Sequence, residues 1–270
     1  MDVNRLEAEW LEPSEFEKYL DGGLSGSLQE SWRDCKRCSL SAVRRGLPVF
    51  GKGNMKSPEI MFIGQSPGGK EEKEGKPFVG PSGNLLDTVL WMLHMESKDY
   101  YYTNVVGCRP RKAPNDDEER DITGVEIRTC MERLHQEIYH VDPLMIVSLG
   151  AVAGHALGGK GRTGDFVDIK IPSRIRGNLI YPLMQTHHPA AILRKIDFRE
   201  GALPTIDSPY ECFHADEHDL YRQFVGDLIK ADTAAQYVRA KYVKATHVPQ
   251  AVREFTICSL KEYRHPEDEP

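Results

Sequence analysis

The chain has 270 residues, of which 40% are hydrophobic and 28% charged, and its formal net charge is −6. This composition is ordinary for a globular protein of one large domain or one domain with extensions, and no apolar run of about 18 residues predicts a membrane span. The acidic start of the chain, Met1 to Leu20, lacks the apolar core of a secretory signal, so we expect a cytoplasmic protein without a membrane partner.

The chain is expected to have three regions, which differ in whether apolar residues recur with the period of a helix or strand. Residues 1–34 predict an N-terminal helical extension, with helical pieces around a glycine-rich turn at 22–26. A main domain is predicted over residues 35–235, with a long polar loop at 196–217. Residues 236–270 predict a C-terminal extension, which ends in an acidic tail.

Within the main domain, short apolar runs alternate with amphipathic segments. The runs predict buried strands at Glu59–Gly64, Tyr100–Val106, Pro143–Gly150 and Leu179–Met184. The amphipathic segments predict helices at Pro81–Met95, Gly124–Tyr139 and Ala151–Leu157, and one or two more between Leu220 and His247. This alternation predicts an α/β fold, a three-layer α/β/α sandwich with a central, mostly parallel four-stranded sheet.

Polar side chains follow the ends of three predicted strands: Gln65, Asn104 and His188. Ligands of parallel sheets bind at the carboxyl ends of the strands, so this placement predicts a site that joins the three residues. Taken singly, each has an ordinary interpretation, since an asparagine after a strand is often a turn former and a lone histidine is often structural.

Six cysteines are present: Cys35, Cys38, Cys108, Cys130, Cys212 and Cys258. Disulfides are rare in the expected compartment, so the Cys35-x-x-Cys38 pair favours metal or redox chemistry. Zinc ribbons usually contain two such pairs, whereas Cys108 and Cys130 are widely separated. The spacing alone leaves an iron–sulfur cluster, a zinc site and unliganded thiols open.

The net negative charge argues weakly against a nucleic-acid partner, but basic residues gather locally. They lie at Arg109, Arg111 and Lys112, at 160–162, at 174–176 and at 194–195. Either a basic face on an acidic protein or a mixed solvated surface fits this pattern.

Several motifs occur in a specific order along the chain. They are Cys35-x-x-Cys38, Val49-Phe-Gly-Lys-Gly-Asn54, Gly64-Gln-Ser-Pro-Gly68, Gly75-Lys-Pro-Phe-Val-Gly80, Gly83-Asn-Leu-Leu86, Tyr102-Thr-Asn-Val-Val106, Cys108-Arg-Pro110, Cys130, Leu149-Gly-Ala151 and His188-Pro-Ala-Ala-Ile-Leu-Arg194. In this order they resemble the family 4 uracil-DNA glycosylases of the uracil-DNA glycosylase superfamily. The resemblance covers roughly residues 35–194 and a helix near the C-terminus.

The resemblance implies a DNA glycosylase that flips uracil out of DNA, hydrolyses its N-glycosidic bond and leaves an abasic site. DNA is then the partner, and a monomer is expected because one pocket reads one base. The resemblance also implies a [4Fe-4S] cluster with Cys35, Cys38, Cys108 and Cys130 as ligands. We expect a structural role for the cluster, because hydrolysis transfers no electron.

The same resemblance assigns roles to five residues around the base. Gln65, Asn104 and His188 are the expected catalytic residues, and together with Ser66 and Phe78 they form the expected base-binding set. Phe78 is expected to stack on the base, although a core phenylalanine is the ordinary interpretation. The Asn104 amide offers a donor and an acceptor to the pyrimidine edge, and His188 is placed to stabilise the departing base anion.

Other residues are expected to contact the rest of the DNA. Ile192, Leu193 and Arg194 are candidates for the wedge that fills the gap in the base stack. Arg109 and Arg111 lead the candidates for phosphate contacts.

The first motif departs from the family, which has glutamate where this chain has Gln65, followed here by Ser66. Glutamine can orient water but is a poor proton acceptor. Gly68 and Gly69 also leave room for a larger base. Two alternatives follow: a glycosylase for a 5-modified pyrimidine, such as hydroxymethylated or glucosylated cytosine in foreign or phage DNA, and a catalytically weak relative that binds damaged DNA. An unrelated metal-binding α/β protein is a further class.

Overall fold

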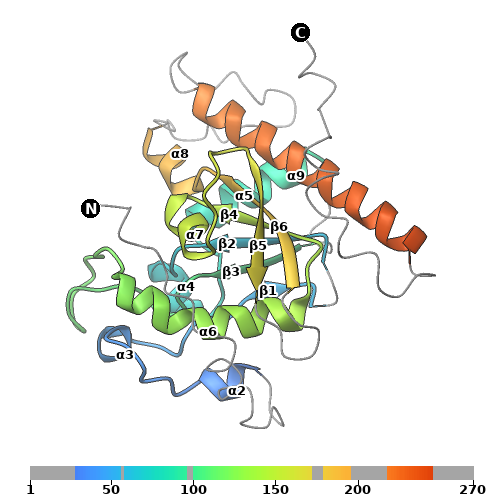
Figure 1. Cartoon of the computed structure of the whole chain (residues 1–270). Coiled ribbons are helices and arrows are strands. Elements are labelled where there is room, and N and C mark those ends of the chain that lie inside the picture. The colour runs from blue at the N-terminus through green and yellow to red at the C-terminus, as the bar shows by residue number, and fades with distance from the viewer. Residues whose placement is uncertain (1–27, 56–57, 96–99, 172–178, 196–217, 246–270) are drawn as a thin grey trace.

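The computed structural model describes residues 28–55, 58–95, 100–171, 179–195 and 218–245. Its centre is a six-stranded sheet of order β1-β3-β2-β4-β6-β5 (Figure 1). The four inner strands are parallel: β3 (Tyr100–Asn104), β2 (Ile60–Gly64), β4 (Met145–Leu149) and β6 (Leu179–Thr186). The edge strands β1 (Lys52–Gly53) and β5 (Phe166–Ile171) are antiparallel to their neighbours.

The predicted α/β sandwich is confirmed, but the prediction of four strands is wrong, because the sheet has six. The four predicted strands are the inner ones, which helices cover on both faces and which therefore appear in the sequence as apolar runs. The two missed strands lie at the edges. β1 has only two residues, and β5 alternates apolar residues with Asp168 and Lys170, so neither forms an apolar run.

One face of the sheet is covered by α5 (Pro81–Met92), α8 (Pro189–Lys195) and α9 (His218–Ala245) (Figure 1). Their apolar side chains form one core with Phe62, Tyr102 and Val147 from the sheet. The helix α9 continues past residue 235, so the predicted domain boundary falls inside it. The predicted loop at 196–217 and most of both predicted extensions lie outside the described residues.

The opposite face is covered by α6 (Gly124–Val141), α7 (Ala151–Ala156) and α3 (Leu40–Val43), which form a second core with alternate residues of the same strands. The short helix α2 (Leu28–Trp32) lies on α6, where the Trp32 indole N–H donates to Gln136 at 2.7 Å. The remaining helix, α4 (Gly69–Glu74), follows β2. None of the helices in the described ranges is long and apolar enough to cross a membrane.

The start of α6 is fixed by a capping box, in which Thr123 and Glu126 exchange side-chain and backbone hydrogen bonds. Glu126 also accepts hydrogen bonds from Arg120 and Ser39. Burial alone would raise the pKa of Glu126, but these donors lower it to about 2. Since Ser39 follows Cys38, the same carboxylate holds the first cysteine segment against α6.

A fully buried ion pair within α6 also contacts the end of β3. The Arg133 guanidinium donates to the Glu137 carboxylate at 2.5 Å, and both side chains are 1% exposed. Its other nitrogen donates to the carbonyls of Asn104 and Val105, the second at 3.2 Å. Arg133 therefore satisfies two buried backbone carbonyls where β3 ends.

The Glu137 carboxylate collects further donors from the same region. The hydroxyls of Tyr101 and Thr103 both donate to it at 2.8 Å, and the Gly51 backbone N–H donates at 2.7 Å. The carboxylate therefore links α6 to β3 and to the residue that precedes β1. A buried charge with this many partners is costly to leave unpaired.

We predict that Arg133→Met lowers the free energy of unfolding by about 3–5 kcal/mol, because Glu137 then stays buried without its counter-charge. Urea denaturation followed by circular dichroism measures the loss. The matched control is Lys70→Met, which removes a surface pair with Glu74 at 3.9 Å and is expected to cost at most about 1 kcal/mol. A loss for Arg133→Met no larger than that of the control would contradict the prediction.

Candidate active site

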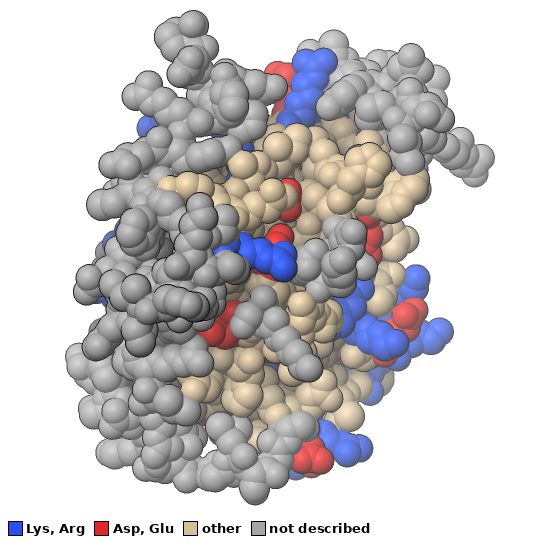
Figure 2. Space-filling view, turned by 90° about the vertical axis from the view of Figure 1, so that its right-hand side faces the viewer, with Lys and Arg blue, Asp and Glu red and all other residues tan. Residues whose placement is uncertain are grey.

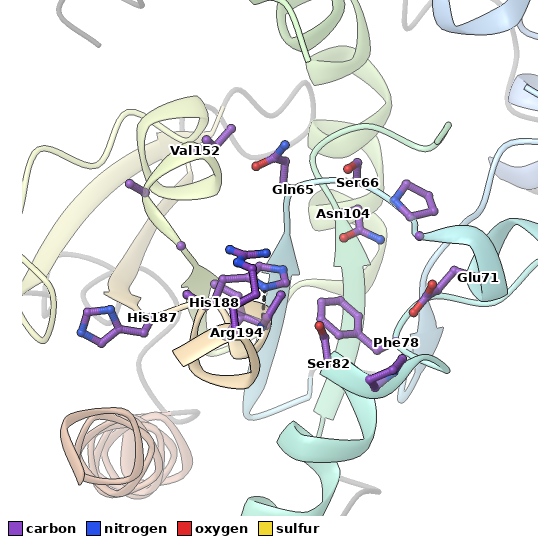
Figure 3. Close-up of a pocket in the computed structure, with 18 of the residues that line it drawn as sticks. Gln65, Ser66, Glu71, Phe78, Ser82, Asn104, Val152, His187, His188 and Arg194 are labelled. Atoms are coloured by element: carbon purple, nitrogen blue, oxygen red, sulfur yellow. Dashed lines mark hydrogen bonds between the residues drawn. The ribbon is translucent and has the colours of Figure 1, made fainter. Parts of the chain in front are cut away.

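A cavity of about 710 Å³ lies at the carboxyl ends of the parallel strands. Gln65 follows β2, Asn104 ends β3 and His188 follows β6, and all three line this cavity, as the strand-end pattern predicted. Figure 3 shows His188 and Arg194 on one side of the cavity, opposite Phe78 and Asn104. The sheet therefore brings together residues that are more than a hundred positions apart in the sequence.

Phe78 and Asn104 meet over Gly64, the last residue of β2. A methyl group on Gly64 would lie 2.5 Å from the Asn104 side-chain oxygen and 2.8 Å from the Phe78 ring. Both contacts are too short, so only glycine lets the ring and the amide approach the strand together. Phe78 is 5% exposed and Asn104 4% exposed, so both are packed before any ligand binds.

His188 is held in one tautomer by the helix that follows it. The Ala190 backbone N–H donates to His188 Nδ1 at 3.0 Å. Burial, assisted by the positive charge of Arg194, lowers the pKa of His188 to about 4. The ring is therefore neutral at physiological pH, and because Nδ1 accepts a hydrogen bond, the proton is on Nε2. His188 offers a neutral N–H donor to the cavity.

Gln65 and Ser66 continue β2 into the wall of the cavity. The Val106 N–H donates to the Gln65 carbonyl at 3.1 Å, so the backbone after β2 stays paired with the chain after β3. Glu71 is a buried carboxylate in the same wall, and its Oε1 accepts the Gly80 N–H at 2.9 Å. Gln185 also lines the cavity, three residues before His188, but it belongs to no motif that points to a site.

The two arginines predicted as phosphate contacts are both engaged within the protein. Arg111 is 2% exposed and binds the carboxylates of Glu72 and Asp117, the second at 2.7 Å. Its guanidinium is not at the surface, so Arg111 is not retained as a phosphate contact. Arg109 is closer to the surface and pairs with Glu119 at 2.7 Å, so a phosphate would compete with that carboxylate.

The three predicted wedge residues differ in exposure. Ile192 is 0% exposed and belongs to the core beneath α8, so it cannot enter a base stack. Leu193 is partly buried against the same core, and Arg194 is exposed and lines the cavity. The helical period explains the difference, because successive residues of α8 face the core, its margin and the solvent.

Charge on the surface is mixed where Figure 2 shows it. Lys and Arg side chains on this face lie beside Asp and Glu side chains, over surface formed mainly by other residues. For this face, the mixed solvated surface is therefore the correct interpretation of the charge pattern.

The four cysteines predicted as ligands come from three parts of the chain. Cys35 and Cys38 lie between α2 and α3, Cys108 follows β3, and Cys130 is on α6. Burial, and after it the nearby Cys130, raises the pKa of Cys108 to about 12. Burial also raises the pKa of Cys38, with contributions from Cys130 and Cys35. The four thiols therefore share one electrostatic neighbourhood.

This neighbourhood has the donor set of an iron–sulfur site. In the part of the chain that the structure describes, no three Cys, His, Asp or Glu side chains form a site for a single metal ion. A four-iron cluster distributes its four thiolates over four metal atoms, so its ligands stand further apart than those of one ion. Arg133 lies close enough to Cys130 for the two to interact, and Arg44 lies close enough to Cys108 to oppose the rise in its pKa. These cations suit an anionic cluster.

The chain is similar to known proteins of one kind, the uracil-DNA glycosylases. The sequence model of the uracil DNA glycosylase superfamily matches residues 50–203. A type-4 uracil-DNA glycosylase from Pyrobaculum aerophilum is 36% identical over 173 residues, which cover 62% of this chain and 84% of that protein. Those from Archaeoglobus fulgidus and Saccharolobus solfataricus are 32% and 36% identical, over 62% and 64% of this chain and 81% and 82% of their own lengths.

We predict that His188 titrates with a pKa near 4 and is neutral, with its proton on Nε2, from pH 5.5 to pH 8. Nitrogen-15 NMR of the histidine side chains measures both properties, and the His188→Asn variant assigns the signal. Arg194→Gln should raise the pKa of His188, because it removes the smaller of the two causes of the shift. A pKa between 6 and 7 for His188, as in model peptides (about 6.5), would contradict the prediction.

Proposed function

The chain belongs to the type-4 family of the uracil DNA glycosylase superfamily, and we propose from this membership that it hydrolyses the N-glycosidic bond of uracil in DNA. The product is an abasic site and free uracil. The observation that carries the proposal is the cavity at the strand ends, where an aromatic ring, an amide and a neutral histidine face one another.

Phe78 and Asn104 supply recognition of the base. A flipped uracil presents a flat face and an edge with one donor, N3–H, and one acceptor, O4. The Phe78 ring gives a stacking surface for the face, and the Asn104 amide matches the edge with an acceptor and a donor. Because both side chains are packed in place, little ordering accompanies binding.

His188 supplies stabilisation of the leaving group. As the glycosidic bond breaks, negative charge collects on the uracil and positive charge on the sugar. The Nε2–H of neutral His188 donates a hydrogen bond to a carbonyl oxygen of the base, where the negative charge grows. With a pKa of about 4, the ring acts at neutral pH as a hydrogen-bond donor and not as a proton donor.

Gln65 is suited to orient the attacking water, but its amide does not accept a proton effectively. We infer that the glycosidic bond breaks before water attacks the sugar. The water then adds to a sugar cation that has already formed, so it must be oriented but does not require a strong base. His188, which favours departure of the base, then carries more of the rate than Gln65.

The cavity is formed by one chain, which supports a monomer acting on DNA. Leu193 and Arg194 remain the proposed wedge, since Leu193 lies at the margin of the core beneath α8 and Arg194 is exposed and lines the cavity. Arg109 remains a proposed phosphate contact, in competition with Glu119.

We further propose that Cys35, Cys38, Cys108 and Cys130 hold a [4Fe-4S] cluster. When bound, the cluster crosslinks the segment before α3, the loop after β3 and the helix α6. Its role is structural, because hydrolysis of the glycosidic bond moves no electron. The four thiols and the neighbouring Arg133 and Arg44 support this assignment.

The proposed activity predicts uracil release from single- and double-stranded oligonucleotides, with a loss of about 10²–10³-fold in the single-turnover rate of His188→Ala. The matched control is His140→Ala, an exposed histidine on α6 away from the cavity, which should keep the wild-type rate. The panel also contains thymine mismatches and hydroxymethylated or glucosylated cytosine. Release of a substituted base without release of uracil would contradict the proposal.

The proposed cluster predicts a brown protein with about four iron and four sulfide per chain and a broad absorption near ~400 nm. Cys130→Ser should lose most of the iron and be less stable to heat, because a ligand and a crosslink are removed. Cys212→Ser, the same substitution outside the predicted ligand set, should keep the full iron content. Stoichiometric zinc in place of iron would contradict the assignment of an iron–sulfur cluster.

A further inference from the structure

Phe78 has a backbone conformation that needs support. Its φ is 51°, in the left-handed region that costs a residue other than glycine about 1–2 kcal/mol. In this conformation Phe78 lines the cavity, while its carbonyl accepts a hydrogen bond from a side chain of β1. A strained residue keeps such a position only where neighbouring groups hold it.

Lys52 is the group that holds the Phe78 carbonyl. It is in the edge strand β1, opposite Tyr102 in β3, and its Nζ donates to the Phe78 carbonyl at 3.0 Å. The carbonyl also lies against the start of α5, where a methyl group on Gly83 would be 2.2 Å from it. The Phe78 carbonyl therefore fits between a lysine donor and a glycine.

The Lys52 ammonium is itself held in place by neighbouring groups. It lies 5.3 Å from the centroid of the Tyr102 ring, and the Tyr102 hydroxyl bonds Asp87 on α5, a carboxylate that also attracts Lys52. The ring centroid of Tyr102 lies 5.8 Å from that of Phe78 and 5.5 Å from that of Phe62, on which Tyr102 stacks. Lys52 therefore makes a charge-assisted hydrogen bond to Phe78 and a cation–π contact with Tyr102, whose ring lies next to that of Phe78.

The far end of the segment is held by a different element. The Gly80 N–H donates to Glu71 in α4 at 2.9 Å, so residues 78–80 are fixed at both ends. Lys52 acts at the end that carries the ring. Unlike Glu71, which lines the cavity, Lys52 does not belong to its lining.

We propose that Lys52 is a positioning residue that preorganises Phe78 for stacking on the flipped base. The inference rests on the proposed function, since it assigns Phe78 the stacking role. Lys52 touches neither the base nor the sugar, so its effect is confined to steps that need the ring in place. Interactions of the protein with DNA that lacks a base are independent of it.

The test compares Lys52→Met, which removes the donor but keeps an unbranched apolar side chain, with Lys52→Arg, which keeps a charged donor. Lys73→Met, an exposed lysine of α4 outside the cavity lining, is the matched control. Three quantities are measured in the full-length protein: the single-turnover rate of uracil release, the Kd for an oligonucleotide with a tetrahydrofuran abasic analogue, and amide hydrogen exchange of residues 76–84.

For Lys52→Met we expect uracil release to fall about 10- to 100-fold, the range that corresponds to a hydrogen bond to a charged group. Binding of the abasic analogue should stay within about twofold, since no base is stacked, and exchange at 76–84 should become faster. Lys52→Arg should recover most of the rate, and the control should match the wild type in all three measurements.

Equal loss of uracil release and of abasic-analogue binding in Lys52→Met would overturn the proposal, because a general disturbance of the fold then explains both. Unchanged exchange at 76–84 would overturn it as well. If the wild type releases no uracil, the proposed function fails, and the exchange measurement alone decides whether Lys52 holds the Phe78 segment.

Discussion

The buried pair of Arg133 and Glu137 is the interaction on which the rest of the site depends. Arg133 binds the carbonyl of Asn104, so α6 fixes the point where β3 ends with the amide that we propose reads the base. The same helix carries Cys130, and Cys108 follows the same strand end. One ion pair therefore joins the cysteine neighbourhood to the cavity. Two buried charges need hydrogen-bonding partners, and the terminal nitrogens of Arg133 and the Glu137 carboxylate have them, which favours one arrangement in this part of the molecule.

The cavity is built mainly by packing and backbone contacts, with little side-chain freedom. Gly64 lets Phe78 and Asn104 approach the same strand end, and the Ala190 N–H sets the tautomer of His188. Burial then keeps His188 neutral. A site with fixed ring, amide and donor stabilises charge as it forms without reorganising, which is the property that cleavage of a glycosidic bond requires.

The predictions that fail have a common physical origin. Residue type and motif position point to Arg111 and Ile192 as DNA contacts, but the first is buried in an ion pair and the second is in the core. Charge type does not show whether a carboxylate from elsewhere in the chain neutralises it. In the same way, the hydrogen bond from Lys52 to the Phe78 carbonyl is invisible in the sequence, because the two residues come from separate segments.

The sequence by itself determined the inner strands, the helix that begins at Gly124 and the polar residues that follow strand ends. These are local patterns: apolar runs, amphipathic periods and short motifs. Only the tertiary structure decided the two edge strands, the burial of the Arg133–Glu137 pair against the end of β3 and the contact of Lys52 with Phe78. Edge strands are short or half-polar. Arg133 and Glu137 are four residues apart on α6, but the groups that bury them come from other elements, so neither feature produces a periodic signal along the chain.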